Sequence, residues 1–262
     1  MLTDILAALS IEVLKLRRSM IFQVTLAAAC FVSLMLALMM WLVMHPDALP
    51  PGILKTKIAI AAISADWPSY ISFTEIAEGA IGIILFGFAF GWIFGREWDD
   101  GTLKDILALP VSRQAIVTVK LIAAGLWCAL MSAVMSVLAL ALGSLLRLPL
   151  WSTELLPEFF RVTAVTTGLT ILLCSPTAFV AGAGRGTLPA VGFVILCMGL
   201  ANFFGNIGLG EYFPWAIPML YTGAIGTAGN RLPLISWIII AFTSLAGCVG
   251  IFMYWRFADQ DK

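Results

Sequence analysis

The chain has 262 residues, of which 61% are hydrophobic and 11% are charged, and 15 basic and 15 acidic residues give a formal net charge of zero. Soluble domains carry about 25% charged and 45–50% apolar residues, so a soluble fold of this length would leave much apolar surface in water. The lack of a basic excess argues against a nucleic-acid-binding surface. One histidine and five cysteines, all five in apolar runs, offer little for zinc or His-based catalysis. We therefore expect a membrane protein with no catalytic residues and no metal site.

Six predominantly apolar runs are each long enough to cross a bilayer as an α-helix, which takes about 20 residues. They predict an all-α polytopic fold in one transmembrane domain, residues 1–262, with spans at 20–44, 76–94, 117–146, 160–183, 188–207 and 235–255. Only the segment Gly184–Thr187 separates the fourth span from the fifth, and Pro189 follows in the first turn of the next helix. We expect a tight helical hairpin there.

Ahead of the first span, residues 2–18 have the pattern of an amphipathic helix. Apolar side chains recur at helical spacing, at Leu2, Ile5, Leu6, Leu9, Val13 and Leu16. The polar side carries Asp4, Glu12, Lys15 and Arg18. Such a helix can lie in the membrane interface. The alternative is a cytoplasmic extension of the first span.

Lysine and arginine are divided unequally between the two sides of the membrane, which predicts the orientation. With the N-terminus inside, ten lie on the cytoplasmic side: Lys15, Arg17, Arg18, Arg96, Lys104, Arg113, Lys120, Arg185, Arg256 and Lys262. The other five lie outside: Lys55, Lys57, Arg147, Arg161 and Arg231. We expect both termini in the cytoplasm. On the outer side, the apolar residues 208–234 are broken by prolines and glycines, and they predict a re-entrant segment before the last span.

The loop between the second and third spans, Gly95–Arg113, contains the densest cluster of charge in the chain. It carries the signals of a short helix, Leu103–Leu109. Asp100 or Thr102 can cap the start of this helix, and Pro110 would end it.

This loop helix would expose Leu103, Ile106 and Leu107 on one side, and Ser112 can cap the third span. A short amphipathic helix of this kind is suited to docking in the groove of a partner protein. A solvated linker between the two spans is the alternative.

The same loop resembles a pattern found after the second span of type-2 ABC exporter permeases. That pattern is a Glu, a Gly-Thr pair, leucines followed by Pro-x-Ser-Arg, and a Lys in the next helix. The matching residues are Glu97, Gly101, Thr102, Leu103, Leu107, Pro110, Ser112, Arg113 and Lys120. The segment Lys104–Ile106 departs from the pattern mildly. In size and single-unit organisation the chain is most similar to bacitracin-export and lantibiotic-immunity permeases.

The resemblance implies the membrane subunit of an ABC transporter in the cell membrane, exporting an amphiphilic or peptide-like substrate. It implies a homodimer, or a pair with a closely related permease, bound to two separate ATPase subunits. The loop helix would then be a coupling helix in the ATPase cleft. A P-loop needs G-x-x-x-x-G-K-[ST], and this chain contains no Gly-Lys pair. We therefore expect ATP and Mg on the partner ATPase, with no cofactor in this chain.

The second span also carries a repeated small residue, at Gly87, Gly91 and Gly95. Glycines four residues apart lie on one helix face and allow a second helix to approach closely. We expect this face to pack against another helix of the same subunit or to form part of the dimer contact.

Three charged residues, Glu75, Glu78 and Arg161, lie near the expected outer ends of their spans. We expect these charges to be solvated or joined in a local Glu–Arg pair. A polar patch at the substrate exit is the alternative. No expected span has an acidic residue at its centre, where an ion-coupled mechanism would place one.

Three other classes of function remain as alternatives to an ABC permease. An ion-coupled secondary transporter would need carboxylates near the middle of the membrane or matching broken spans in two halves. An intramembrane enzyme would need paired Asp residues, a Ser/His pair or a zinc triad within the spans, and the sequence shows none. A non-transporting membrane scaffold would be distinguished only by whether activity depends on a partner.

Overall fold

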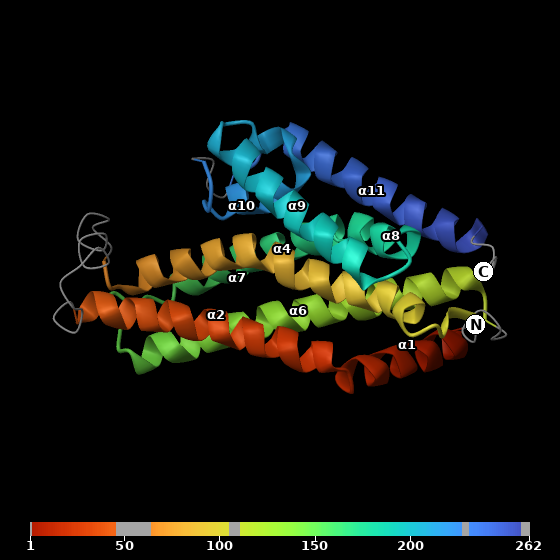
Figure 1. Cartoon of the computed structure of the whole chain (residues 1–262). Coiled ribbons are helices and arrows are strands. Elements are labelled where there is room, and N and C mark those ends of the chain that lie inside the picture. The colour runs from red at the N-terminus through yellow and green to blue at the C-terminus, as the bar shows by residue number, and fades with distance from the viewer. Residues whose placement is uncertain (1, 46–63, 105–110, 227–230, 258–262) are drawn as a thin grey trace.

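The computed structural model describes residues 2–45, 64–104, 111–226 and 231–257. All regular elements in these residues are helical, and six candidate spans are long and apolar enough to cross a membrane. The long helices run alongside one another, and α1, the end of α4 and the end of α11 lie at the same end of the bundle (Figure 1). The expected all-α polytopic membrane fold is confirmed.

The first two helices are separated by a short break. Helix α1 covers Leu2–Arg17 and α2 covers Met20–Met44. The hydroxyl of Ser19 donates to the carbonyl oxygen of Leu16 over 2.6 Å and accepts from the amide of Phe22 over 3.3 Å. This one side chain therefore closes α1 and caps α2.

Helix α4, Trp67–Asp99, is longer at both ends than the apolar run that predicts it. It begins well before Ile76, because Asp66 caps it by accepting a 2.9 Å hydrogen bond from the amide of Ser69. It continues past Phe94 through two charged residues that are buried. Its 33 residues extend about 50 Å at 1.5 Å per residue, whereas the hydrocarbon core of a bilayer is about 30 Å thick.

Four further helices, which form three candidate spans, follow in the middle of the chain. Helix α6, Arg113–Leu145, is capped as predicted by Ser112, whose hydroxyl accepts from the amide of Ala115 over 3.2 Å. Helices α7, Leu155–Leu173, and α8, Ser175–Ala183, form one span that changes direction near Pro176, which lacks the amide hydrogen a continuous helix needs. Helix α9, Thr187–Asn206, returns after a tight turn.

The broken apolar segment before the last span forms three short helical pieces. They are η2 at Gly210–Tyr212, η3 at Pro214–Ala216 and α10 at Ile217–Tyr221, and α11, Leu234–Phe257, follows. Every residue of α10 is buried. Its backbone is therefore enclosed by protein, which is the setting that irregular structure needs at membrane depth.

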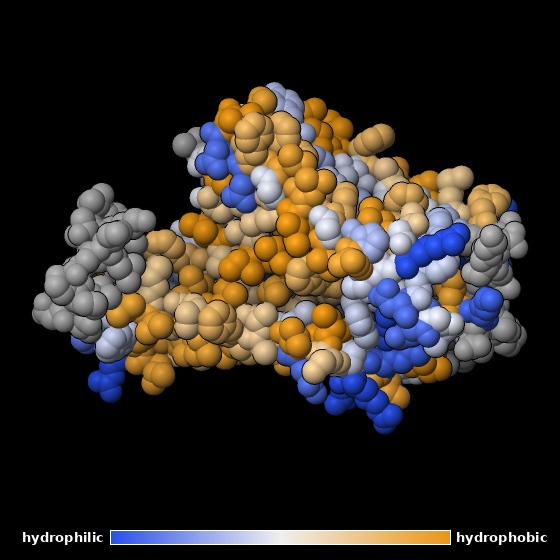
Figure 2. All heavy atoms as spheres, in the orientation of Figure 1, coloured by the Kyte–Doolittle hydropathy of each residue, from blue (hydrophilic) through white to orange (hydrophobic). Residues whose placement is uncertain are grey.

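The surface of the bundle matches its expected solvent. Figure 2 shows apolar side chains across the middle of one face, while hydrophilic residues gather mainly at the end where α1 and the end of α4 lie. Large apolar residues are exposed along the spans, such as Phe31 on α2, Leu196 on α9 and Phe242 on α11. Lipid is the natural solvent for such surfaces.

Candidate functional site at the end of α4

Four charged side chains meet inside the bundle near the last turns of α4. Lys120 on α6 donates from Nζ to Glu97 Oε1 over 2.5 Å and to the carbonyl oxygen of Ile93 over 2.9 Å. Arg96 donates from Nε to the same Glu97 oxygen over 3.1 Å, and from Nη2 to Glu12 Oε2 over 2.9 Å. We call Glu12, Arg96, Glu97 and Lys120 the ion cluster.

The ion cluster is removed from water, and this determines what it can do. Lys120 is 0% exposed and Glu97 is 1% exposed. Charges in such surroundings persist when they are paired and hydrogen-bonded, and here two acids meet two bases. The indole of Trp92 adds a ring face 4.7 Å from the guanidinium carbon of Arg96. The cluster joins α1, α4 and α6 at one point.

The position of Glu12 differs from the sequence interpretation. The helical pattern placed it on the polar side of the N-terminal helix, with no partner in the chain, and its side chain is only 11% exposed and contacts Arg96. Lys15, three residues on, lies at the edge of the cluster, 3.3 Å from Glu12 and 40% exposed. The pattern could not reveal the difference, because the partner of Glu12 lies 84 positions away in the sequence.

The last residues of α4 also hold the start of α9. Asp99 Oδ2 accepts from the amide of Thr187 over 3.0 Å and from its hydroxyl over 2.5 Å. A carboxylate at this place satisfies a free amide and interacts favourably with the positive end of the helix dipole. The guanidinium of Arg185 lies 5.5 Å from the ring centre of Trp98 in the same region. Sequence analysis missed this cap, because its two partners are 88 positions apart.

The glycine face of α4 lies against α9 of the same subunit. A Cβ atom on Gly87 would lie 2.5 Å from the side chain of Val194, and one on Gly91 would lie 2.9 Å from that of Ala190. A Cβ atom on Gly95 would lie 2.5 Å from the backbone nitrogen of Thr187, which cannot move aside as a side chain can. The glycines therefore let two helix backbones approach closely inside the subunit.

The structure describes the beginning of the predicted coupling loop as far as residue 104. Gly101 has a positive φ of 67°, a conformation that glycine adopts without strain. Thr102 is exposed. Leu103 and Lys104 are helical, but Leu103 is half-buried and packs against the core of the bundle. The rest of the expected helix Leu103–Leu109 lies outside the described residues. It includes two of the predicted site residues, Ile106 and Leu107. A third predicted site residue, Pro110, also lies outside the described residues.

The end of the loop is attached to the last span. Arg113, the first residue of α6, donates from Nη1 to the carbonyl oxygens of Trp255 over 3.3 Å and Arg256 over 3.4 Å. Cationic donors suit the free carbonyl groups at a helix end. Both ends of the loop are therefore fixed, one to α4 and the other to α6 and α11.

A second polar cluster lies deep inside the bundle, and here the sequence interpretation was wrong. Glu78 was assigned to the outer end of a span, but α4 begins at Trp67, so Glu78 lies about 16 Å along the helix from that residue. Glu78 is 2% exposed, and its Oε1 accepts from the hydroxyls of Ser132 and, over 2.8 Å, Thr167. Arg161 pairs instead with Glu158 of its own helix.

A threonine-rich face on α7 was the sequence signal that could have revealed this cluster. The hydroxyl residues Thr163, Thr166, Thr167 and Thr170 fall within two turns of an otherwise apolar span. Buried hydroxyls need partners, so such a face predicts polar groups on the neighbouring helices.

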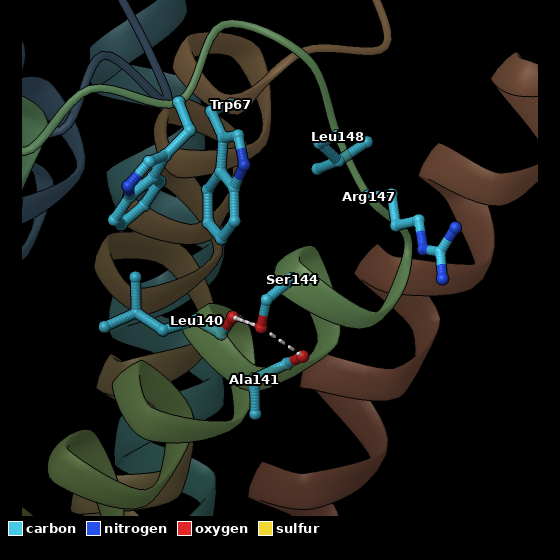
Figure 3. A pocket seen from close by; sticks show the side chains of 7 residues that line it. Trp67, Leu140, Ala141, Ser144, Arg147 and Leu148 are labelled. Atoms are coloured by element: carbon cyan, nitrogen blue, oxygen red, sulfur yellow. Dashed lines mark hydrogen bonds between the residues drawn. The ribbon is translucent and has the colours of Figure 1, made fainter.

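Two of the cavities on the described surface lie at different places on the bundle. One, of about 430 Å³, lies between α6 and α7. The other, of about 530 Å³, lies at the Trp67 end of the bundle and is lined by Trp67, Leu140, Ala141, Ser144, Arg147, Leu148 and Trp151. In Figure 3 the hydroxyl of Ser144 is turned back to the carbonyl oxygens of Leu140 and Ala141, so the walls of this second cavity are largely apolar.

These features connect segments of the bundle mechanically. The ion cluster, the Asp99 cap and the glycine face all belong to the half of α4 nearest the loop, and they join α4 to α1, α6 and α9. A displacement of the loop would therefore act on four helices at once.

Known proteins agree with this architecture. The sequence profile of the ABC-2 family transporter proteins matches residues 8–202. A bacitracin transport permease protein, BCRB, of Bacillus licheniformis is 27% identical over 180 residues, which are 68% of this chain and 86% of that protein. Because the family profile covers most of the chain, including α4, the loop and α9, the chain belongs to the ABC-2 family of transporter proteins and is the membrane subunit of an ABC transporter.

Proposed function

We propose that this subunit exports an amphiphilic or peptide-like substrate and that a separate ATPase supplies the energy. The observation that carries the proposal is the attachment of the charged loop. The loop begins at the end of α4, next to the Asp99 cap and the ion cluster. It ends at Arg113, the first residue of α6, whose side chain is hydrogen-bonded to the end of α11. A partner docked on this loop would push on buried, paired groups rather than on a flexible connection.

The proposed transmission runs through α4. The ion cluster would carry a displacement of α4 to α1 and α6, and the Asp99 cap and the glycine face would carry it to α9. Well-packed interiors move as units because they deform little. The relative named as a bacitracin transport permease supports a cargo of comparable chemistry.

The proposal can be tested on the assembled transporter. Co-expression with an ABC ATPase encoded beside this chain should yield a stable complex, and native mass spectrometry should find two permeases, identical or closely related, and two ATPases. Reconstituted vesicles should export a fluorescent amphiphile only with ATP and Mg²⁺. An ATPase with its P-loop lysine replaced is the control, because it binds the permease but hydrolyses no ATP. A single permease in the complex, or transport that ignores ATP, would contradict the proposal.

The position of Glu78 favours a second candidate, an ion-coupled secondary transporter. A carboxyl group buried inside a bundle of membrane-spanning helices is a candidate for ion or proton coupling. The same vesicles separate the two mechanisms. Transport driven by a proton or sodium gradient without ATP would support the second candidate.

We also propose that both chain ends and the loop face the cytoplasm of the cell membrane. In a variant without the five native cysteines, Lys104→Cys places one thiol at an exposed loop position. A membrane-impermeant maleimide should label it only after the cells are permeabilised. Arg147→Cys, on the exposed turn at the opposite end of the bundle, should be labelled in intact cells. The reverse pattern would invert the proposed orientation.

A further inference from the structure

The groove between α6 and α7 has an apolar rim and a polar floor. Its volume is about 430 Å³, within the range of small-molecule sites, about 300–1,000 Å³. The exposed rim consists of Ala129, Ala133, Val137, Phe160, Ala164 and Gly168. The buried floor consists of Ser132, Ser136, Thr163 and Thr167. The groove opens sideways on the bundle surface, where lipid chains would surround it.

The floor can accept hydrogen bonds more readily than donate them. Ser132 and Thr167 both direct their hydroxyls at Glu78 Oε1 and lie 2.7 Å from each other, so their hydrogens are used within the cluster. The hydroxyl of Ser136 donates to the carbonyl oxygen of Ser132 over 3.0 Å. A hydroxyl that has donated its hydrogen retains lone pairs. A ligand that satisfies these three hydroxyls must therefore bring donors, whereas the hydroxyl of Thr163, which has no hydrogen-bond partner among the described residues, can donate or accept.

The carboxyl group of Glu78 behind the floor has no positively charged partner among the described residues. Glu78 Oε2 is buried and has no hydrogen-bond partner among the described residues. The nearby cation, Arg161, is held by Glu158 over 2.5 Å and by the hydroxyl of Tyr221 over 2.8 Å. Within the described chain, neither Glu75 nor Glu78 forms an ion pair. A buried carboxylate with unused acceptor capacity favours a ligand that carries a positively charged donor.

We propose that this groove binds an amphiphile with a protonated amino group. The amino group would donate to the floor hydroxyls in front of Glu78, and the apolar part of the molecule would lie along the rim between α6 and α7. The inference identifies the substrate class of the proposed exporter and rests on that function for its biological meaning. The binding itself requires neither ATP nor the ATPase.

Photolabelling of the full chain in phosphatidylcholine nanodiscs tests the binding directly. The probe is a long-chain primary alkylamine with a diazirine near the amino group. The alcohol and the fatty acid of the same chain length, with the same diazirine, are the comparison probes. Peptide mass spectrometry should place the amine label on residues 129–137 and 160–168. The alcohol should label these residues more weakly, and the fatty acid should label them least.

Two variants probe the polar floor and the open space of the groove. Glu78→Gln keeps the size of the side chain but removes the carboxylate from behind the floor hydroxyls. It should weaken amine binding by about tenfold or more, because the ammonium group then loses its electrostatic attraction to that carboxylate. Gly168→Leu should abolish labelling, because a Cβ there meets no atom within 4 Å and its side chain would fill the groove. Gly192→Leu on α9 is the matched control, since that glycine is also exposed with equally open surroundings.

Thermal unfolding of each variant shows whether lost labelling reflects lost structure. The selectivity of the unmodified chain for amine over acid needs no variant at all. Equal labelling by amine and fatty acid, or an unchanged affinity in Glu78→Gln, would overturn the proposal by showing a groove filled by ordinary lipid. Crosslinks from the groove to a second copy of this chain would overturn it by showing a subunit interface. Failure of ATP-driven export would leave the binding result intact.

Discussion

Replacing Lys120 with methionine is expected to destabilise the protein by about 3–5 kcal/mol, the cost of leaving a buried charge without its partner. Lys120 is fully buried and donates to Glu97 over 2.5 Å. Methionine has nearly the same length but no charge, so it fills the space while Glu97 retains only Arg96. Equilibrium unfolding in mixed micelles of a mild detergent and dodecyl sulfate measures the loss.

The charge balance of the ion cluster makes this prediction specific. Adding Glu97→Gln to Lys120→Met removes the unpaired charge, so the double variant should be more stable than the single variant. Lys15→Met is the control, because Lys15 is 40% exposed and contacts Glu12 at the edge of the cluster; exposed pairs contribute about 0–1 kcal/mol. Equal effects of Lys15→Met and Lys120→Met would show that burial does not determine the strength of the cluster.

The sequence predicts the spans well because membrane burial depends on composition over about 20 residues. The apolar run that predicts α2 has the same limits as the helix, Met20–Met44. The run that predicts α4 is too short, because Arg96 and Glu97 look like the start of a water-exposed loop. Their charges are buried by Glu12 and Lys120 from two other helices. Such pairing depends on tertiary structure, and the hydropathy of one segment gives no information about which residues of other helices lie against it.

Residue depth was the hardest property to predict. A window that began at Ile76 left Glu78 near the end of its span, and only the Asp66 cap shows that the helix begins earlier. The glycine face was visible as a spacing, but its partner helix, α9, was not. For Glu97, the sequence indicated a place in the loop pattern but no contact within the chain. The structure places it against Lys120 and Arg96 of the same chain.

The same contacts also refine which loop residues should anchor the ATPase. Leu103 was expected on the docking side, yet it is half-buried against the bundle core. An aspartate at this position would disturb the fold as well as any docking. Ile106 and Leu107, which follow in the sequence, lie outside the described residues and remain the predicted anchors. They are therefore the positions at which docking can be tested separately.

Replacing both Ile106 and Leu107 with aspartate is expected to release the ATPase from the permease. Apolar anchors in a short docking helix typically contribute about 1–3 kcal/mol each, so losing two of them should weaken the complex by about thirtyfold or more. Aspartate adds a charge that must be desolvated in the ATPase groove. Co-purification of the ATPase and substrate-stimulated ATP hydrolysis in proteoliposomes measure the two consequences, binding and coupling.

The matched control is the conservative pair Ile106→Val and Leu107→Met, which keeps both side chains apolar and should retain the ATPase. The aspartate variant should unfold at the same detergent fraction as the unmodified chain, because the ion cluster and the Asp99 cap that hold the loop ends are intact. Normal stability with lost ATPase binding would identify the loop as the docking element. If the aspartate variant keeps both ATPase binding and stimulation, the loop is a linker, and the force of ATP hydrolysis must enter the bundle elsewhere.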